Sequence, residues 1–311
     1  MDPKLLNKFL ISIIIAIIIY AAFFFFSDFT KIYDKLENFN LIYLFPILSL
    51  VFLSWCILFF RWMLFLKNLN ISIPIKSNFV IFISSFSLSA TPGQVGELIK
   101  SQLLKNRFNI PISKTAPLVF VERLYDLIGA LVVSILGIWF LENGALVVGV
   151  MSTVLLFIFL LIRSRKTFTK ISFLLNKLPF LRGKLDNFPT IYESINPCVS
   201  KKMLFYASTF SVIYWLLIGA SAYFVLVGLG IDAINLINMI SIYSSSLILG
   251  AVSLIPGGIG VAEGSIASLL TLGGVDISVA LVIGILIRIF TLWFGVSLGV
   301  IFLKISGGLK N

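Results

Sequence analysis

Two short Pro-Gly stretches interrupt long apolar sequence, one in each half of the chain. The first reads Pro-Gly-Gln-Val-Gly-Glu at residues 92–97, and the second reads Pro-Gly-Gly-Ile-Gly at residues 256–260. Such a break frees backbone N–H and C=O groups that lipid cannot satisfy, so it is tolerated only where protein or a wet cavity surrounds it. Paired breaks in corresponding places of two halves are typical of the binding site of a transporter.

The rest of the 311 residues predicts an all-α polytopic integral membrane protein with a single membrane domain, 1–311. Hydrophobic residues make up 59% of the chain and charged residues only 12%, which excludes a water-soluble fold for most of it. A helix needs about 20 apolar residues to cross a bilayer. Apolar runs of about this length predict six full spans, near residues 9–26, 41–60, 115–141, 145–162, 203–229 and 278–303.

Two further apolar stretches, 77–104 and 233–275, contain the Pro-Gly breaks and are predicted to be re-entrant hairpins. Basic residues mark cytoplasmic segments, so Lys4 and Lys8 place the N-terminus inside. The charged residues farther along the chain predict that the first hairpin enters and leaves the membrane on the cytoplasmic side. They predict that the second hairpin enters and leaves it on the outer side. The first leg of the second hairpin, at 234–254, is also long enough to cross the bilayer completely.

These elements predict an inverted-topology repeat in the plasma membrane, with both termini cytoplasmic. Its N-terminal half is 9–141 and its C-terminal half is 145–306. A loop at 163–202 carries nine basic and two acidic residues and is predicted to be cytoplasmic. Because much of the net charge of +11 follows topology in this way, no nucleic acid is expected as a partner.

The breaks themselves are candidate binding sites. Glycine after proline lets the backbone turn and approach a ligand closely, and the helix that restarts offers free N–H groups to an anion, most simply a phosphate. The alternative is that the glycines only permit tight packing of a kinked helix. The candidate residues are Pro92, Gly93 and Gly96 in the first break and Pro256, Gly257, Gly258 and Gly260 in the second.

Six ionisable residues complete the candidate site: Glu97, Glu122, Arg123, Asp126, Glu263 and Arg288. Glu97 and Glu263 each lie where a helix restarts, and they either cap that helix or meet a cationic group, a proton or an arginine. Spacings of three and four residues place Asp126 beside both Arg123 and Glu122, which predicts an internal ion pair.

Arg288 has no acid in its own span. A charged side chain at mid-membrane costs at least about 2.5–3.5 kcal/mol, so Arg288 must find a partner elsewhere. Glu263 and a lipid phosphate are the candidate partners. In the resulting hypothesis Arg123 and Arg288 hold a phosphate, while Glu97 and Glu263 gate the site or bind the rest of the ligand.

Several residue types argue against a catalytic or metal centre. The chain has no histidine, which removes histidine from acid–base and metal chemistry. Cys56 and Cys198 show no metal or redox spacing, and no nucleotide-binding motif is present, so neither a metal nor a cofactor is expected. The five tryptophans are expected to be packing or interface residues: Trp55, Trp62, Trp139, Trp215 and Trp293.

Three segments in this order resemble the lysylphosphatidylglycerol synthase transmembrane, or flippase-like, family (UPF0104). They are 91–97 with Lys100 downstream, Val-Glu-Arg-Leu-Tyr-Asp at 121–126, and 255–264. In bifunctional members this region is associated with moving aminoacylated phospholipid between leaflets, and a separate soluble domain makes that lipid. No loop here is large enough for such a domain, so the resemblance implies the lipid-handling half alone.

We therefore expect a lipid-binding membrane protein, and not an enzyme, that facilitates flipping of an anionic phospholipid, an aminoacyl-phospholipid or a polyprenyl-phosphate-linked lipid. The expected partners are membrane lipids with anionic headgroups. One alternative is a membrane transferase acting on a lipid phosphate, with Glu97, Glu122 or Asp126 as base or metal ligand. Another is a non-transporting partner that binds a separate glycosyl- or aminoacyltransferase through the loop 163–202.

Overall fold

The computed structural model describes residues 3–25, 28–136, 153 and 188–307 of the chain. The regular structure in these segments is entirely helical. Three helical stretches among them are long and apolar enough to cross a membrane: Leu41–Asn68, Lys201–Gly228 and Ile277–Ile305. They coincide with three of the six predicted spans, so the all-α membrane class is confirmed.

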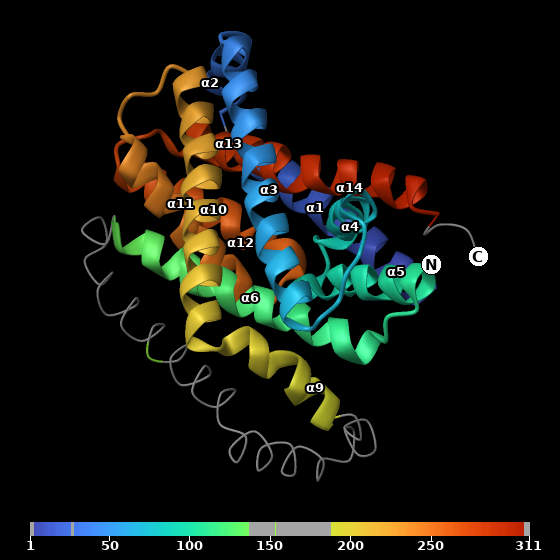
Figure 1. The fold of residues 1–311 in the computed structure, drawn as a ribbon. Coiled ribbons are helices and arrows are strands. Elements are labelled where there is room, and N and C mark those ends of the chain that lie inside the picture. The colour runs from blue at the N-terminus through green and yellow to red at the C-terminus, as the bar shows by residue number, and fades with distance from the viewer. Residues whose placement is uncertain (1–2, 26–27, 137–152, 154–187, 308–311) are drawn as a thin grey trace.

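The centre of the molecule is an antiparallel pair of long helices, α3 (Leu44–Asn68) and α10 (Lys201–Gly228), which run side by side in Figure 1. The Asn40 N–H donates to the Gly228 carbonyl at 2.9 Å, which joins the start of one helix to the end of the other. Each helix buries residues spaced three or four apart, the period of one helix face. The buried stripes are Ile47, Val51, Trp55, Leu58, Trp62 and Phe65 on α3, and Met203, Ala207, Ser211, Trp215, Ile218, Ala222 and Val225 on α10.

The helix α6 (Ile112–Ser134) packs across α10 and against the first part of the second broken segment. A glycine permits this crossing, because a Cβ placed on Gly129 would lie 2.7 Å from the backbone of Ser211. Of the predicted span 115–141, residues 115–134 belong to this helix. Its ionisable residues lie near the middle of the helix rather than at an end.

The first broken segment consists of α4 (Ile75–Ser85), two 3₁₀ turns (Phe86–Leu88 and Pro92–Leu98) and α5 (Ile99–Phe108). The 11 residues of α4 span about 17 Å and the 10 of α5 about 15 Å, so neither helix alone crosses a hydrocarbon core of about 30 Å. Hydroxyl side chains in the break satisfy carbonyls three or four residues earlier: Ser84, Ser85, Ser87, Ser89 and Thr91.

The second broken segment consists of α11 (Leu236–Val252), a 3₁₀ turn (Pro256–Gly258) and α12 (Val261–Leu272). Its 17-residue first leg spans about 26 Å and its 12-residue second leg about 18 Å. Three glycines in the break have left-handed φ values, which side chains with a Cβ rarely adopt. These are Gly257 at +60°, Gly258 at +66° and Gly260 at +86°.

The last apolar stretch is interrupted by a π-helical segment. Helix α13 (Ile277–Arg288) passes through this segment (Ile289–Trp293) into α14 (Phe294–Ile305). π-Segments inside longer helices are frequent at functional sites. Helix α14 packs on the first broken segment at Gly299, where a Cβ would lie 2.2 Å from the Ser87 nitrogen.

The remaining helices pack mainly on α13 and α6. Helix α1 (Pro3–Phe25) is followed by α2 (Phe29–Glu37) and a 3₁₀ turn (Leu41–Tyr43), while α9 (Phe188–Ile195) and the turn Asn196–Val199 precede α10.

Several predictions fall outside the described residues. The predicted span 145–162, apart from Thr153, and residues 163–187 of the predicted basic loop lie there. The count of six spans and the inverted repeat therefore stay predictions. Both cysteines are free, and Cys198 is buried in a turn.

A charged cavity at the contact of the two breaks

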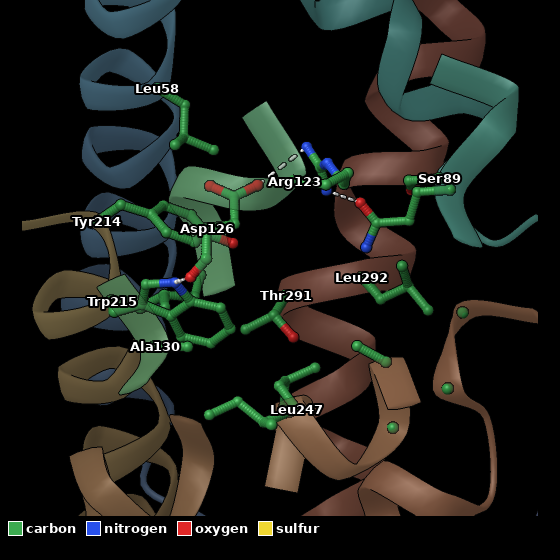
Figure 2. A pocket seen from close by; sticks show the side chains of 18 of the residues that line it. Leu58, Ser89, Arg123, Asp126, Ala130, Tyr214, Trp215, Leu247, Thr291 and Leu292 are labelled. Carbon is green, nitrogen blue, oxygen red and sulfur yellow. Dashed lines mark hydrogen bonds and ion pairs between the residues drawn. The ribbon is translucent and has the colours of Figure 1, made fainter. Parts of the chain in front are cut away.

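The two Pro-Gly breaks, 164 residues apart in sequence (256 − 92), meet in space. A Cβ placed on Gly257 would lie 3.3 Å from the Cα of Ala90, just ahead of the first break. A cavity of about 310 Å³ opens beside this contact and is lined by both breaks. Figure 2 shows Arg123 lying between Asp126 and Ser89, with Tyr214 and Trp215 on one side of the cavity and Leu292 on the other.

Arg123 is the centre of the first cluster of charges. Its Nη2 lies 3.2 Å from Glu97 Oε2 and 3.1 Å from Asp126 Oδ2, and its Nη1 donates to Gln94 Oε1. The predicted pair between Arg123 and Asp126 is therefore confirmed. The Arg123 side chain is 28% exposed, and it lines the cavity together with Gln94, Glu97 and Asp126.

Two fully buried cations extend this cluster behind Arg123. Arg61 on α3 places Nη1 2.6 Å from Asp126 Oδ1 and donates to Ser211 Oγ. Lys100 on α5 donates to Glu122 Oε2, and its Nζ lies 3.7 Å from Glu97 Oε2 and 4.6 Å from the centre of the Trp62 ring. The cluster thus holds three cations and three carboxylates and is formally neutral.

Sequence reasoning missed the roles of Arg61 and Lys100. Basic residues served there only to orient the segments of the chain, whereas the side chains of Arg61 and Lys100 are fully buried and paired with carboxylates. The positive-inside rule counts basic residues near loops and does not see carboxylates that approach from other helices. The sequence did contain one signal of these cations. Three acids in apolar sequence (Glu97, Glu122 and Asp126) outnumber the one arginine near them, Arg123, by two negative charges, which require two further cations.

The second cluster is smaller and more completely buried. Arg288 Nε lies 3.1 Å from Glu263 Oε1, and Arg288 Nη2 donates to the Gly257 carbonyl. The Gly260 N–H donates to Glu263 Oε2 at 2.7 Å, so this carboxylate also caps the restarted helix α12. The Tyr20 hydroxyl on α1 donates to Glu263 Oε1 at 2.8 Å. Glu263 is therefore both the partner of Arg288 and a helix cap, the two roles that its position suggested.

The predicted site residues divide into a cavity group and a supporting group. Glu97, Arg123, Asp126, Gly257, Gly258 and Arg288 line the cavity. Glu122 instead faces Lys100, while Glu263 and Gly260 form the cap. Pro92 and Gly93 begin the 3₁₀ turn of the first break and Pro256 begins that of the second.

Gly96 has a packing role. A Cβ at this position would lie 2.4 Å from both Leu88 Cβ and Leu88 O, and its N–H donates to Thr91 Oγ1 at 2.8 Å. The alternative of tight packing therefore holds at this glycine, while the second break needs its glycines for left-handed backbone.

Aromatic side chains form much of the apolar wall of the cavity. They come from four elements and include two tryptophans expected only to pack: Trp55, Phe86, Tyr214, Trp215 and Tyr243. Trp215 Nε1 donates to the Asp126 carbonyl at 2.7 Å, which joins this wall to the charged cluster. Among the described residues, no group of three or more Cys, Asp or Glu is arranged to hold a metal ion.

The fold and this site define a helical membrane protein with paired charges around an internal cavity. The chain matches the family described as the lysylphosphatidylglycerol synthase TM region over residues 13–299, and it belongs to that family. It is 26% identical over 229 residues to a UPF0104 membrane protein of Methanocaldococcus jannaschii, covering 70% of this chain and 92% of that protein. It is also 26% identical over 277 residues to a UPF0104 membrane protein of Pyrococcus horikoshii, covering 79% and 81% respectively.

Proposed function

We propose that this protein binds the headgroup of a phosphate-bearing membrane lipid in the cavity and facilitates movement of that lipid between leaflets. The observation that carries the proposal is the cavity itself, where both breaks, a partly exposed guanidinium and an aromatic wall meet. A guanidinium binds phosphate through charge-assisted hydrogen bonds. The neighbouring apolar wall suits the glycerol and the first methylene groups of the lipid.

The size of the cavity supports a headgroup rather than a whole lipid. Its volume of about 310 Å³ is at the low end of the roughly 300–1,000 Å³ range of ligand pockets. In this proposal the headgroup crosses through the protein while the acyl or polyprenyl chains remain in the bilayer.

The short helices support a re-entrant arrangement. In the proposed inverted repeat, α4 and α5 enter from the cytoplasm, and α11 and α12 enter from outside, with the breaks meeting between the two faces. An irregular backbone at that depth is tolerated because it is buried in protein and lines a cavity. Both termini are then cytoplasmic, and the protein resides in the plasma membrane.

The membership of this family supports a role with lipids, and the proposed substrates are an anionic phospholipid, an aminoacyl-phospholipid or a polyprenyl-phosphate-linked lipid. No observation favours the transferase alternative. The two carboxylates that line the cavity, Glu97 and Asp126, are both paired with Arg123, whereas a general base needs access to a substrate proton.

A proteoliposome assay tests the proposal. Leaflet-to-leaflet movement of labelled lipids is measured for the wild type, for Ala251→Trp and for Val252→Trp. Ala251 lines the cavity, whereas its neighbour Val252 is 59% exposed and lies outside the lining. We expect movement of a phosphate-bearing lipid with the wild type and with Val252→Trp, and its loss with Ala251→Trp. Movement no faster than in empty vesicles, for every lipid tested, would refute the proposal.

A further inference from the structure

The two arginines that line the cavity differ in exposure. The Arg123 side chain is 28% exposed, whereas that of Arg288 is 4% exposed. The Nε of Arg123 also has no hydrogen-bond partner in the described part of the protein. Arg123 therefore has both access to the cavity and an unused donor.

Each carboxylate bound to Arg123 has a second cation. Asp126 is held by Arg61 at 2.6 Å, and Glu97 lies 3.7 Å from Lys100. Removing one partner of a buried ion pair is strongly unfavourable when the remaining charge is left alone. Because these second cations are present, Arg123 can turn toward an anion while Asp126 keeps Arg61 and Glu97 keeps Lys100, which it then shares with Glu122.

Arg288 has no such freedom. Within the described part of the chain, the other groups that donate hydrogen bonds to the Glu263 carboxylate are the Tyr20 hydroxyl and the Gly260 N–H, both of which are neutral. Moving Arg288 would leave the fully buried Glu263 carboxylate without a cation. It would also remove a donor from the Gly257 carbonyl, which lies in the second break.

We infer that Arg123, and not Arg288, is the residue that binds the lipid phosphate, an inference that rests on the proposed function. Arg288 instead fixes the second break. This differs from the expectation that both arginines hold the phosphate.

When Arg123 leaves its carboxylates for the phosphate, the first break is affected as well. Arg123 holds that break through Gln94 and Glu97, and Gln94 has a left-handed φ of +53°, a conformation that costs energy for a residue other than glycine. When Arg123 turns to the phosphate, both contacts are released. Binding of a headgroup therefore loosens the first break while the second stays fixed.

A titration of the full-length protein in maltoside detergent tests the inference. The ligands are dihexanoyl phosphatidylglycerol and dihexanoyl phosphatidic acid, with uncharged dihexanoylglycerol as the reference. Tryptophan fluorescence reports binding, because Trp55 and Trp215 line the cavity. We expect Arg123→Gln to remain folded and to bind both phosphate lipids at least tenfold more weakly, with no preference over the uncharged lipid. Arg123→Lys should recover part of this preference.

A matched control variant replaces both partners of the ion pair between Arg288 and Glu263. Glu263→Gln/Arg288→Met leaves no buried charge unpaired, and we expect it to keep the preference for both phosphate lipids over dihexanoylglycerol, even if its overall affinity falls and Arg288→Gln alone does not fold. Hydrogen exchange adds a readout that a purely structural residue would not change. Phosphatidylglycerol should speed exchange of backbone amides in 94–98 in the wild type and not in Arg123→Gln.

Three results are decisive. Wild-type affinity of Arg123→Gln for the phosphate lipids would overturn the inference and leave the proposed function intact. The same holds if the double variant loses its preference for phosphate. If the wild type itself shows no preference over dihexanoylglycerol, both the proposed function and the inference fail.

Discussion

The pair of Arg288 and Glu263 should dominate the stability of the second break. Both side chains are almost completely buried, and their Nε–Oε1 distance is 3.1 Å. Arg288→Met removes the cation and leaves the Glu263 carboxylate with two neutral donors. The same change removes the donor to the Gly257 carbonyl.

The expected loss of stability follows from these contacts. Leaving a buried carboxylate without its cation costs about 3–5 kcal/mol. Leaving the Gly257 carbonyl without its donor adds about 1–3 kcal/mol if no water replaces it. We therefore expect Arg288→Met to lower the free energy of unfolding by about 4–8 kcal/mol, which corresponds to a midpoint roughly 6–12 °C lower for a chain of this size.

Thermal unfolding in detergent, followed by helical circular dichroism, measures this effect. Glu263→Gln/Arg288→Met is the informative control, because replacing both charges avoids the unpaired carboxylate. We expect the double variant to unfold at least several degrees above Arg288→Met. A single variant as stable as the wild type, or a double variant no better than the single, would refute the reasoning.

Two further predictions concern packing and the surface. Gly96→Ala should destabilise the protein by about 1–3 kcal/mol, because its Cβ would lie 2.4 Å from Leu88 atoms. Gly264→Ala should be tolerated, since no atom from another element of the described structure lies within 4 Å of its Cβ, and thermal unfolding of both variants checks this. Lys31 and Asp276 form an exposed ion pair. Their mutual hydrogen bond is the largest cause of a lowered pKa at Asp276 and of a raised pKa at Lys31. The small contribution of this pair to the stability of the fold should be constant between about pH 5 and pH 9. It should be lost as the pH falls through the lowered pKa of the Asp276 carboxyl, or as the pH rises through the raised pKa of the Lys31 ammonium. Unfolding midpoints of wild type and Lys31→Met across pH test this, and a difference that changes between pH 5 and pH 9 would contradict it.

Some of the site follows from local sequence and from the cost of burying charge. A spacing of three residues was sufficient to predict the contact between Arg123 and Asp126. Glu263 was one of two candidate partners for Arg288, because an arginine in an apolar helix without an acid needs a partner from another segment or from a ligand, and the structure shows the pair with Glu263. The breaks themselves were predictable because few residues other than proline and glycine interrupt a helix in this way.

The rest of the site depends on contacts between distant elements. Arg61 is 65 residues from Asp126 in sequence, and Lys100 is 22 residues from Glu122. No periodicity within one helix relates these partners, so their pairing becomes visible only when the packing of α3, α5 and α6 is known. The aromatic wall has the same origin, since Trp55 and Trp215 reach the cavity only because α3 and α10 pack as an antiparallel pair.

The two breaks show why a repeated sequence pattern does not imply a repeated role. In both, a glutamate pairs with an arginine that also holds the break, through the Gln94 side chain in one case and the Gly257 carbonyl in the other. What distinguishes them lies outside the pattern. Buried cations stand behind the first pair, whereas a tyrosine hydroxyl from α1 stands behind the second. A cation can compensate a buried carboxylate, whereas a hydroxyl cannot. Arg123 can therefore leave its carboxylates for a ligand, and Arg288 cannot.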